Sequence, residues 1–137
     1  MWWIYALLAA FFAALTAIFA KIGLKDVNSD LATAIRTVVI LVIAWGVAIF
    51  KGETRHISLI SKQGLLFLVL SGIATGLSWL FYFKALQMGK VSQVAPVDKL
   101  SLALAIILSI IFLGEPLNWK IAIGGILIIA GTMVLIL

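Results

Sequence analysis

The sequence predicts an all-α membrane protein with five transmembrane helices. Of its 137 residues, 65% are hydrophobic and 11% are charged, less than half the charged fraction of an average soluble domain. The apolar residues form five runs of 19–21 residues, the length that crosses one bilayer. Because backbone groups in lipid must be hydrogen-bonded internally, and because the runs do not alternate apolar with polar residues as barrel strands do, they are predicted as helices.

The five spans are predicted to form a single domain over residues 1–137. The first span, Trp2–Ala20, is expected to be a retained helix, since it lacks a basic leading segment and its apolar run is too long for a signal peptide. The predicted location is the cell (inner or plasma) membrane, crossed several times. The remaining spans are Leu31–Phe50, Gly64–Phe83, Val94–Leu113 and Leu117–Leu137.

Three charged residues fall inside the second and fourth spans. The charge-free run Thr37–Phe50 is too short to cross a bilayer, so the second span includes Arg36. The run 100–113 is also too short, so the fourth span includes Asp98 and Lys99. A charge near a helix centre costs about 2.5–3.5 kcal/mol, and such residues usually face a protein interior or a wet cavity. These three residues are therefore candidate binding residues, and the alternative is an ion pair, such as Arg36 with Asp98, that only holds helices together.

A stripe of hydroxyl side chains runs along the third span. Ser71, Thr75, Ser78 and Tyr82 are spaced 4, 3 and 4 residues apart and so share one helix face. A single hydroxyl in a membrane helix usually donates to the carbonyl four residues earlier. For four aligned positions, a face that lines a binding cavity is favoured.

A second stripe beside it combines small and aromatic residues. Gly72 and Gly76 make a G-x-x-x-G step, which allows another helix to approach closely. They are followed by Trp79 and Phe83 on the same face. Trp79 lies too far inside the span for an interface aromatic and is predicted to stack on a cation or an aromatic ligand. Tyr82 fits either that role or the interface.

The fourth span begins around Pro96, and the fifth is rich in glycine. A proline beyond the first turn leaves carbonyls unsatisfied, and freed carbonyls beside Asp98 would suit a cation or a proton. Asp98 and Lys99 point about 100° apart on a helix, so they are not expected to be partners by default, and Lys99 can extend toward the head groups. The fifth span is predicted to pack closely against another helix, for example that of a second copy, through Gly124, Gly125 and Gly131.

Basic residues outside the spans show almost no bias between the two membrane faces. Four lie on each side. Because orientation follows such bias, the chain is predicted to insert both ways up, so that two opposed copies can pair as inverted repeats do within one chain. The alternative is an orientation set by another feature. The two sets are Lys51, Arg55, Lys62 and Lys120, and Lys21, Lys25, Lys84 and Lys90.

The remaining composition argues against several classes of site. The chain has no Cys and one His, His56, which is expected to be a solvated loop residue, so no disulfide or metal site is predicted. Nucleophile–base sets and phosphate-binding glycine loops are also missing, so neither an enzyme nor a cofactor is expected. The net charge of +5 is spread over loops and helix ends, where basic residues meet lipid head groups rather than nucleic acid.

Three segments resemble the EamA repeat of the drug/metabolite transporter superfamily. They are Y-F-K-A-L-Q-M-G-K-V-S-Q-V-A-P (residues 82–96), L-G-E-P-L (113–117) and G-G-I-L-I-I-A-G (124–131). The resemblance implies a single-repeat, half-size transporter that acts as an antiparallel homodimer of ten helices. The last helix is similar to the dimerising helix of small multidrug resistance proteins. Their proton-binding glutamate has no counterpart in the first span here, so Asp98 is the candidate substitute, and Glu115 is expected to brace a turn.

The resemblance and the charges together predict a secondary transporter that moves a small polar or charged metabolite by alternating access. Arg36, Lys84 and Lys99 would meet anionic groups of the substrate, and Asp98 would take a proton or an amine. The expected partners are the substrate, the lipid bilayer and a second copy of the chain. The alternatives are a channel or lipid-linked flippase subunit of the same fold, and a non-transporting scaffold or partner subunit that has Arg36 paired with Asp98 and no open cavity.

Overall fold

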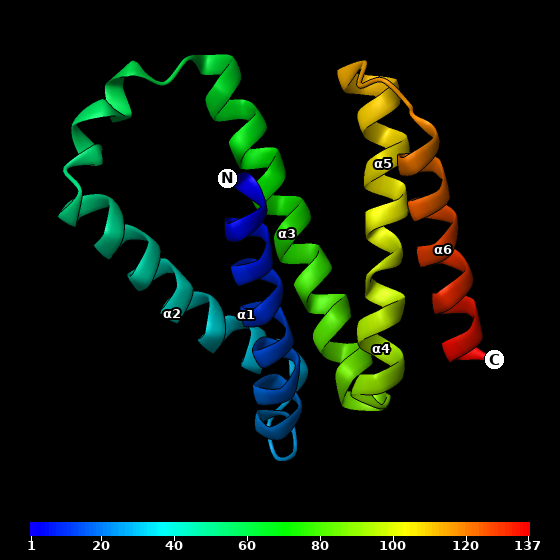
Figure 1. Ribbon diagram of the computed structural model, residues 1–137. Helices are drawn as coiled ribbons and strands as arrows, with labels where there is room; N and C mark the ends of the chain where they lie inside the picture. Colours follow the sequence, from blue (N-terminus) through cyan, green and yellow to red (C-terminus); the bar gives the residue numbers. More distant parts are fainter. The chain divides into compact units, whose positions relative to one another are not determined.

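The computed structural model describes residues 1–137 and contains only helices and their connections (Figure 1). Five helical stretches are long and apolar enough to cross a membrane, which confirms the predicted fold class. The chain forms two compact units, with one boundary within the first helix and the other at the end of the third span. Unit 1 comprises Met1–Ile18 and Met88–Leu137, and unit 2 comprises Phe19–Gln87. The helices are α1 (Trp2–Gly23), α2 (Ser29–Phe50), α3 (Lys62–Met88), α4 (Val91–Asp98), α5 (Leu100–Leu113) and α6 (Trp119–Ile136), with a 3-10 helix, η1 (Glu53–Leu59), between α2 and α3.

In unit 2, helix α2 begins with a side-chain cap. The Asn28 side chain accepts a hydrogen bond from the Asp30 backbone N–H at 2.8 Å, which satisfies one of the donors left free at a helix start. Asp30 also places a negative charge in the first turn, where the helix dipole favours it. The helix therefore starts at Ser29, two residues before the predicted Leu31.

The buried side chains of unit 2 gather where α3 ends. Phe83 and Leu86 of α3 are fully buried, and Leu24, just after α1, is 3% exposed. Helix α3 therefore continues past the predicted end at Phe83 to Met88, because its last turn contributes to this small core. Lys84, expected in a connection, consequently lies within the helix.

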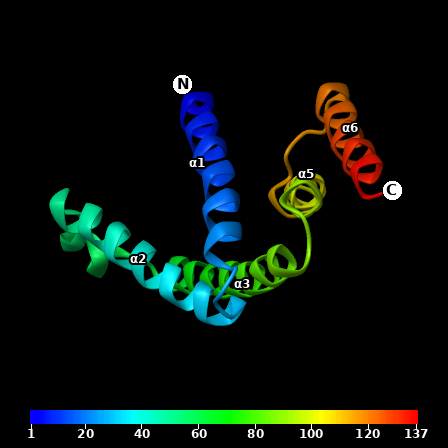
Figure 2. The same ribbon diagram turned by 90° about the horizontal axis from the view of Figure 1, so that it is seen from below.

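Two hydrogen bonds tie the end of α3 to the last turn of α1 and to the α1–α2 connection. Lys21 Nζ donates to the Leu86 carbonyl at 2.5 Å, so a cation meets a carbonyl at a helix C-terminus. Gln87 Nε2 donates to the Val27 carbonyl at 3.0 Å. Figures 1 and 2 show α2 and α3 close together at this end and spreading apart toward η1. Side chains that reach from one helix to the other are therefore expected near the closed end.

In unit 1, α4 and α5 follow one another with a break at Lys99. The Lys99 and Leu102 backbone N–H groups donate to carbonyls three residues earlier, at 3.0 Å each, so the chain tightens at this point. Pro96 lies three residues before the break and removes one backbone donor, which is a common cause of such irregularity. The span begins at Val91 rather than at the predicted Val94.

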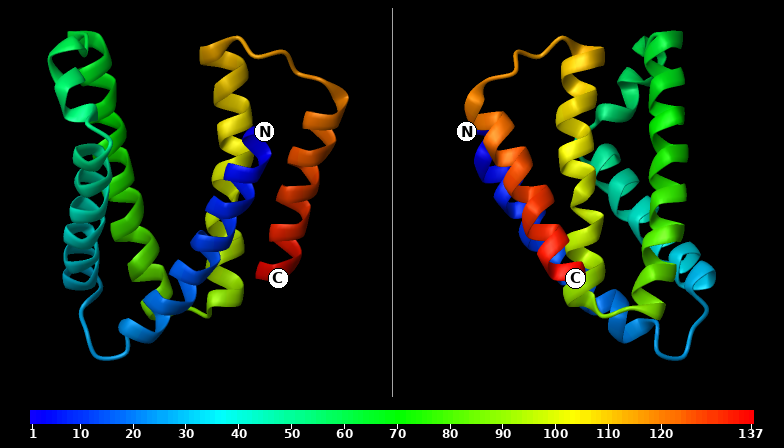
Figure 3. Two further views of the ribbon diagram at one scale, coloured as in Figure 1. Left: turned by 60° about the vertical axis from the view of Figure 1, so that its left-hand side comes forward. Right: turned by 90° about the vertical axis from the view of Figure 1, so that its right-hand side faces the viewer.

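Helix α6 runs alongside α5 after an extended connection over residues 114–118 (Figure 3). Helix α5 ends at Gly114, whose φ of +66° is a left-handed conformation that glycine adopts without steric cost. The Asn118 side chain then caps α6 by accepting from the Ile121 N–H at 3.0 Å. On the packed face of α6, Gly125 is buried and Thr132 is 4% exposed.

Candidate functional site

Arg36 projects from α2 onto two aromatic rings of α3. Its Cζ atom lies 4.4 Å from the centroid of the Trp79 ring and 4.8 Å from that of the Phe83 ring. Both distances are within the range in which a cation is attracted to an aromatic face. The same face of α2 carries the buried Thr33, whose hydroxyl donates to the Ser29 carbonyl at 2.8 Å, so the helix presents a polar side to this end of unit 2.

The guanidinium of Arg36 has no acidic partner within unit 2. The one ion pair in that unit joins Glu53 to His56, at 3.2 Å in the exposed η1 segment. A guanidinium carries five N–H donors in a planar fork, and stacking on a ring leaves its edges available. Half-buried Arg36 is therefore a cation held on two aromatic rings with no carboxylate of its own unit beside it, and a guanidinium is suited to binding a carboxylate or a phosphate.

The cation stacked on Trp79 therefore belongs to the protein itself, whereas the sequence predicted only that Trp79 stacks on a cation or ligand. Phe83 was not among the predicted binding residues, although its four-residue spacing from Trp79 places both on one helix face. The signal that could have identified Phe83 is this spacing together with an arginine on the preceding span.

One side chain of the hydroxyl stripe along α3 is hydrogen-bonded within its own helix, as is usual for a single hydroxyl in a membrane helix. Thr75 Oγ1 donates to the Ser71 carbonyl at 2.9 Å, so this hydroxyl is satisfied by its own helix. Ser78 is exposed, and Tyr82 is half-buried. The Tyr82 ring packs edge-on against Phe83, with 6.1 Å between centroids, and so belongs to the aromatic group around Arg36.

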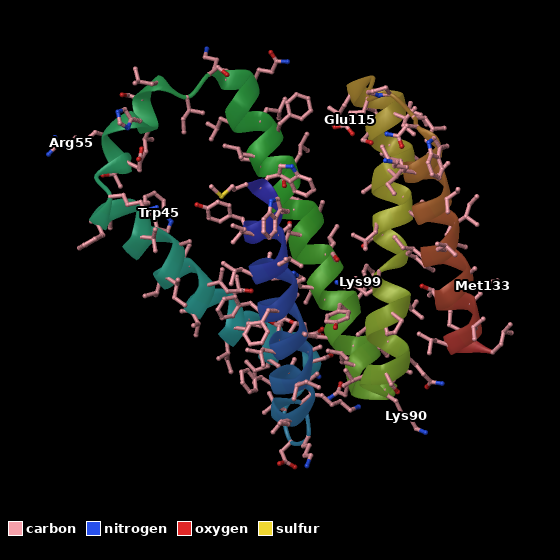
Figure 4. The ribbon with its side chains drawn as sticks, in the orientation of Figure 1. Trp45, Arg55, Lys90, Lys99, Glu115 and Met133 are labelled. Carbon is pink, nitrogen blue, oxygen red and sulfur yellow. The ribbon has the colours of Figure 1, made fainter.

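In unit 1, Asp98 and Lys99 contact each other at the break between α4 and α5. Lys99 Nζ lies 3.2 Å from Asp98 Oδ2, although the regular helical angle between neighbours argued against a default pairing. The helix is irregular here, with ψ of −7° at Lys99, and the long lysine stem can fold back onto the preceding carboxylate. Figure 4 shows Lys99 partway along the α4–α5 span, between the labelled Lys90 and Glu115.

The carbonyl of Pro96 is occupied rather than free. It accepts the Lys99 backbone N–H at 3.0 Å, and Thr132 Oγ1 of α6 approaches it at 3.3 Å. Thr132 also donates to the Ile128 carbonyl at 2.8 Å. A proline leaves without a donor the carbonyl four residues earlier, which is that of Ser92, so the predicted cation ligand stays a prediction.

The other predicted site residues divide between open and packed surfaces. Lys84 is exposed on α3. Gly72, Gly76 and Gly131 each have open space where a side chain would begin, as does Gly124. Gly125 instead packs within the chain, because a Cβ there would lie 3.7 Å from Ile106 Cδ1 of α5.

The family model described as "EamA-like transporter family" matches residues 1–137. The chain belongs to this family. This EamA protein is also 49% identical over 134 residues to a protein of a Sinorhizobium species described as "Uncharacterized transporter in cobO 3'region". The match covers 98% of this chain and 95% of that relative. No solved structure matches the chain.

Family membership confirms the resemblance drawn from the sequence and assigns the general activity. The EamA protein is a membrane transporter, and its five apolar helices make it a multi-pass protein of the cell membrane. The chain has the size of a single repeat, since its relative is of nearly equal length.

Proposed function

We propose that this EamA protein is a secondary transporter that moves a small metabolite with an acidic group across the membrane by alternating access. The observation that carries the proposal is the position of Arg36, which lies over Trp79 and Phe83 with no acid of unit 2 to neutralise it. Its planar fork matches the oxygen pairs of a carboxylate or a phosphate.

Energetics support a ligand at this position. A charge within a membrane helix costs about 2.5–3.5 kcal/mol at the centre and less toward the end. Two aromatic contacts recover part of that, at about 0.5–2 kcal/mol each. A bound anion would add charge-assisted hydrogen bonds of about 1.5–3 kcal/mol, so the occupied state would be favoured over the empty one.

We assign supporting roles to the other polar residues. Lys84 and Lys99 would meet further anionic groups, and Tyr82, Ser78 and Thr75 would form the polar wall along α3. Asp98 would take a proton or an amine. Because its carboxylate contacts Lys99 at 3.2 Å, an anion that draws Lys99 away would leave Asp98 free to accept a proton.

Alternating access would come from two oppositely oriented copies. The even distribution of basic residues and the single-repeat length support this arrangement. The open glycines Gly72, Gly76 and Gly131 are the proposed points of close helix approach. Reporter fusions at the C-terminus are expected to give signal from both faces of the membrane, and signal from one face alone would exclude dual insertion.

The substrate class can be tested with purified full-length protein. A thermal-shift screen of carboxylate, phosphate and amine metabolites should show stabilisation by anions, since a ligand that prefers the native state raises its apparent stability. Arg36→Gln should abolish that stabilisation. Arg55→Gln, which removes one positive charge from exposed η1, is the matched control and should preserve it. Stabilisation by amines alone, or by anions equally in both variants, would refute the anionic substrate.

A further inference from the structure

A cavity of about 280 Å³ lies between α5 and α6 in unit 1, near the turn that joins them. Its only polar side chains are Ser109 and Glu115. The Ser109 hydroxyl is already used, because it donates to the Ile106 carbonyl at 2.9 Å. The rest of the wall is apolar, and includes Ile106, Ile110, Ile121, Gly124, Gly125 and Ile128.

The carboxylate of Glu115 lies where membrane proteins meet lipid head groups. It follows the end of α5 at Leu113 by two residues, and Trp119 opens the next span. A tryptophan at the first residue of a span belongs to the interfacial belt. Figure 4 places Glu115 at the α5–α6 turn, at the far end of the α4–α5 span from Lys90. The cavity therefore has a charged mouth at head-group depth and apolar walls at acyl-chain depth.

The backbone of Glu115 is held by a hydrogen bond, but its carboxylate is not neutralised by a basic side chain of its unit. Its backbone N–H donates to the Ser109 carbonyl at 3.3 Å, which holds the turn, while no basic side chain of unit 1 pairs with its carboxylate. A second cavity, between α2 and η1, differs in this respect. Its carboxylate, Glu53, is paired with His56 at 3.2 Å.

We propose that the α5–α6 cavity binds a phospholipid with a primary ammonium head group, with one acyl chain between the helices and the ammonium on Glu115. The two environments of the cavity match an amphiphile of this kind. An anionic lipid would be repelled by the carboxylate, and a lipid with a quaternary ammonium could not donate a hydrogen bond to it. A small soluble amine would leave the apolar wall unfilled, which forgoes most of the available binding energy.

Native mass spectrometry of the full-length protein, reconstituted in vesicles of equal phosphatidylethanolamine, phosphatidylcholine and phosphatidylglycerol, tests the proposal. The protein should retain phosphatidylethanolamine about 1.4- to 5-fold more than phosphatidylglycerol, the preference expected from one ion pair at the membrane surface. Glu115→Gln should abolish that preference. Ile128→Trp, which fills the cavity, should reduce retention of all three lipids.

Glu53→Gln is the matched control. It removes the same charge from the same membrane face, because two spans separate the two connections, and it should leave the preference unchanged. Equal loss in the two glutamine variants would show a general surface-charge effect and overturn the proposal. A lack of lipid preference in the unmodified protein would also overturn the proposal. Displacement of the lipid by free ethanolamine would reassign the site to a soluble amine, and cross-linking of Ile128→Cys between two chains would reassign it to a second copy.

Discussion

The cation on α2 and the charges at the α4–α5 break are stabilised in different ways. Arg36 lies over the faces of Trp79 and Phe83, 4.4 and 4.8 Å from their centroids, with no carboxylate of its unit in contact. Asp98 and Lys99 instead contact each other at 3.2 Å. Ring faces reduce the cost of burying a cation but do not use its N–H donors, whereas a carboxylate neutralises its partner and uses donors directly.

The difference separates a place that can hold a ligand from a place that can release a proton. A guanidinium without a carboxylate partner in its unit gains from an incoming anion, so Arg36 is suited to the proposed recognition. A paired carboxylate and ammonium gain little from an anion until the pair opens, so Asp98 and Lys99 are suited to coupling.

Replacing Arg36 should have the largest effect on transport. Removal of one partner from a desolvated, hydrogen-bonded charge pair costs about 2–5 kcal/mol, so Arg36→Gln should lower kcat/KM for the proposed anionic substrate by about 30- to 5,000-fold. Arg36→Lys keeps the charge but loses the planar fork and its stacking, and should recover only part of this. Initial rates of uptake into proteoliposomes measure both. Full activity of the lysine variant would show that a point charge is sufficient.

Removing the aromatic support should weaken binding without removing the charge. Trp79→Leu should raise KM by about 2- to 30-fold, the range expected from one cation–π contact, and leave kcat nearly unchanged. Trp45→Leu is the control, because Trp45 is an exposed tryptophan on the same helix as Arg36. An equal rise in KM for both variants would mean that loss of tryptophan, rather than loss of the ring under Arg36, is responsible.

The Asp98–Lys99 pair should show modest energetic coupling and a clear effect on pH dependence. A double-mutant cycle with Asp98→Asn and Lys99→Gln should give a coupling of about 0.2–1 kcal/mol in unfolding experiments, because both side chains are partly exposed. Asp98→Asn should also flatten the pH dependence of transport. If the pH profile of that variant matches the unmodified protein, Asp98 has no part in proton coupling.

Thr132 should contribute least. Its hydroxyl, on α6, lies between the Ile128 and Pro96 carbonyls at 2.8 and 3.3 Å. Thr132→Val should reduce the free energy of unfolding by about 0.6 kcal/mol, the average for hydrogen bonds between membrane helices, and Thr132→Ser should preserve most of it. A loss well above this value would indicate that the hydroxyl also holds the geometry of the break at Lys99.

Hydropathy alone predicted the fold class, whereas the residues at which helices end or break were harder to predict from the sequence. The five spans follow from runs of apolar residues whose length matches a bilayer, and the structure has five such helices. The extension of α3 to Met88 depends instead on Leu86, which is buried beside the α1–α2 connection. The break at Lys99 follows Pro96, and a proline in a sequence does not specify on which residue the helix will tighten.

Hydropathy and segment length are properties of single segments, and they are enough to predict that the chain is helical, lies in a membrane and carries three charges within its spans. The sequence also contains segments that resemble the EamA repeat, and the family match confirms that resemblance. The partners of the charges, in contrast, could be identified only from the packed helices. The contact of Arg36 with Trp79 and Phe83, and the use of the Pro96 carbonyl by Thr132, depend on how closely separate helices approach and which faces they present. Those contacts arise from packing between segments, which cannot be predicted from the periodicity of one segment.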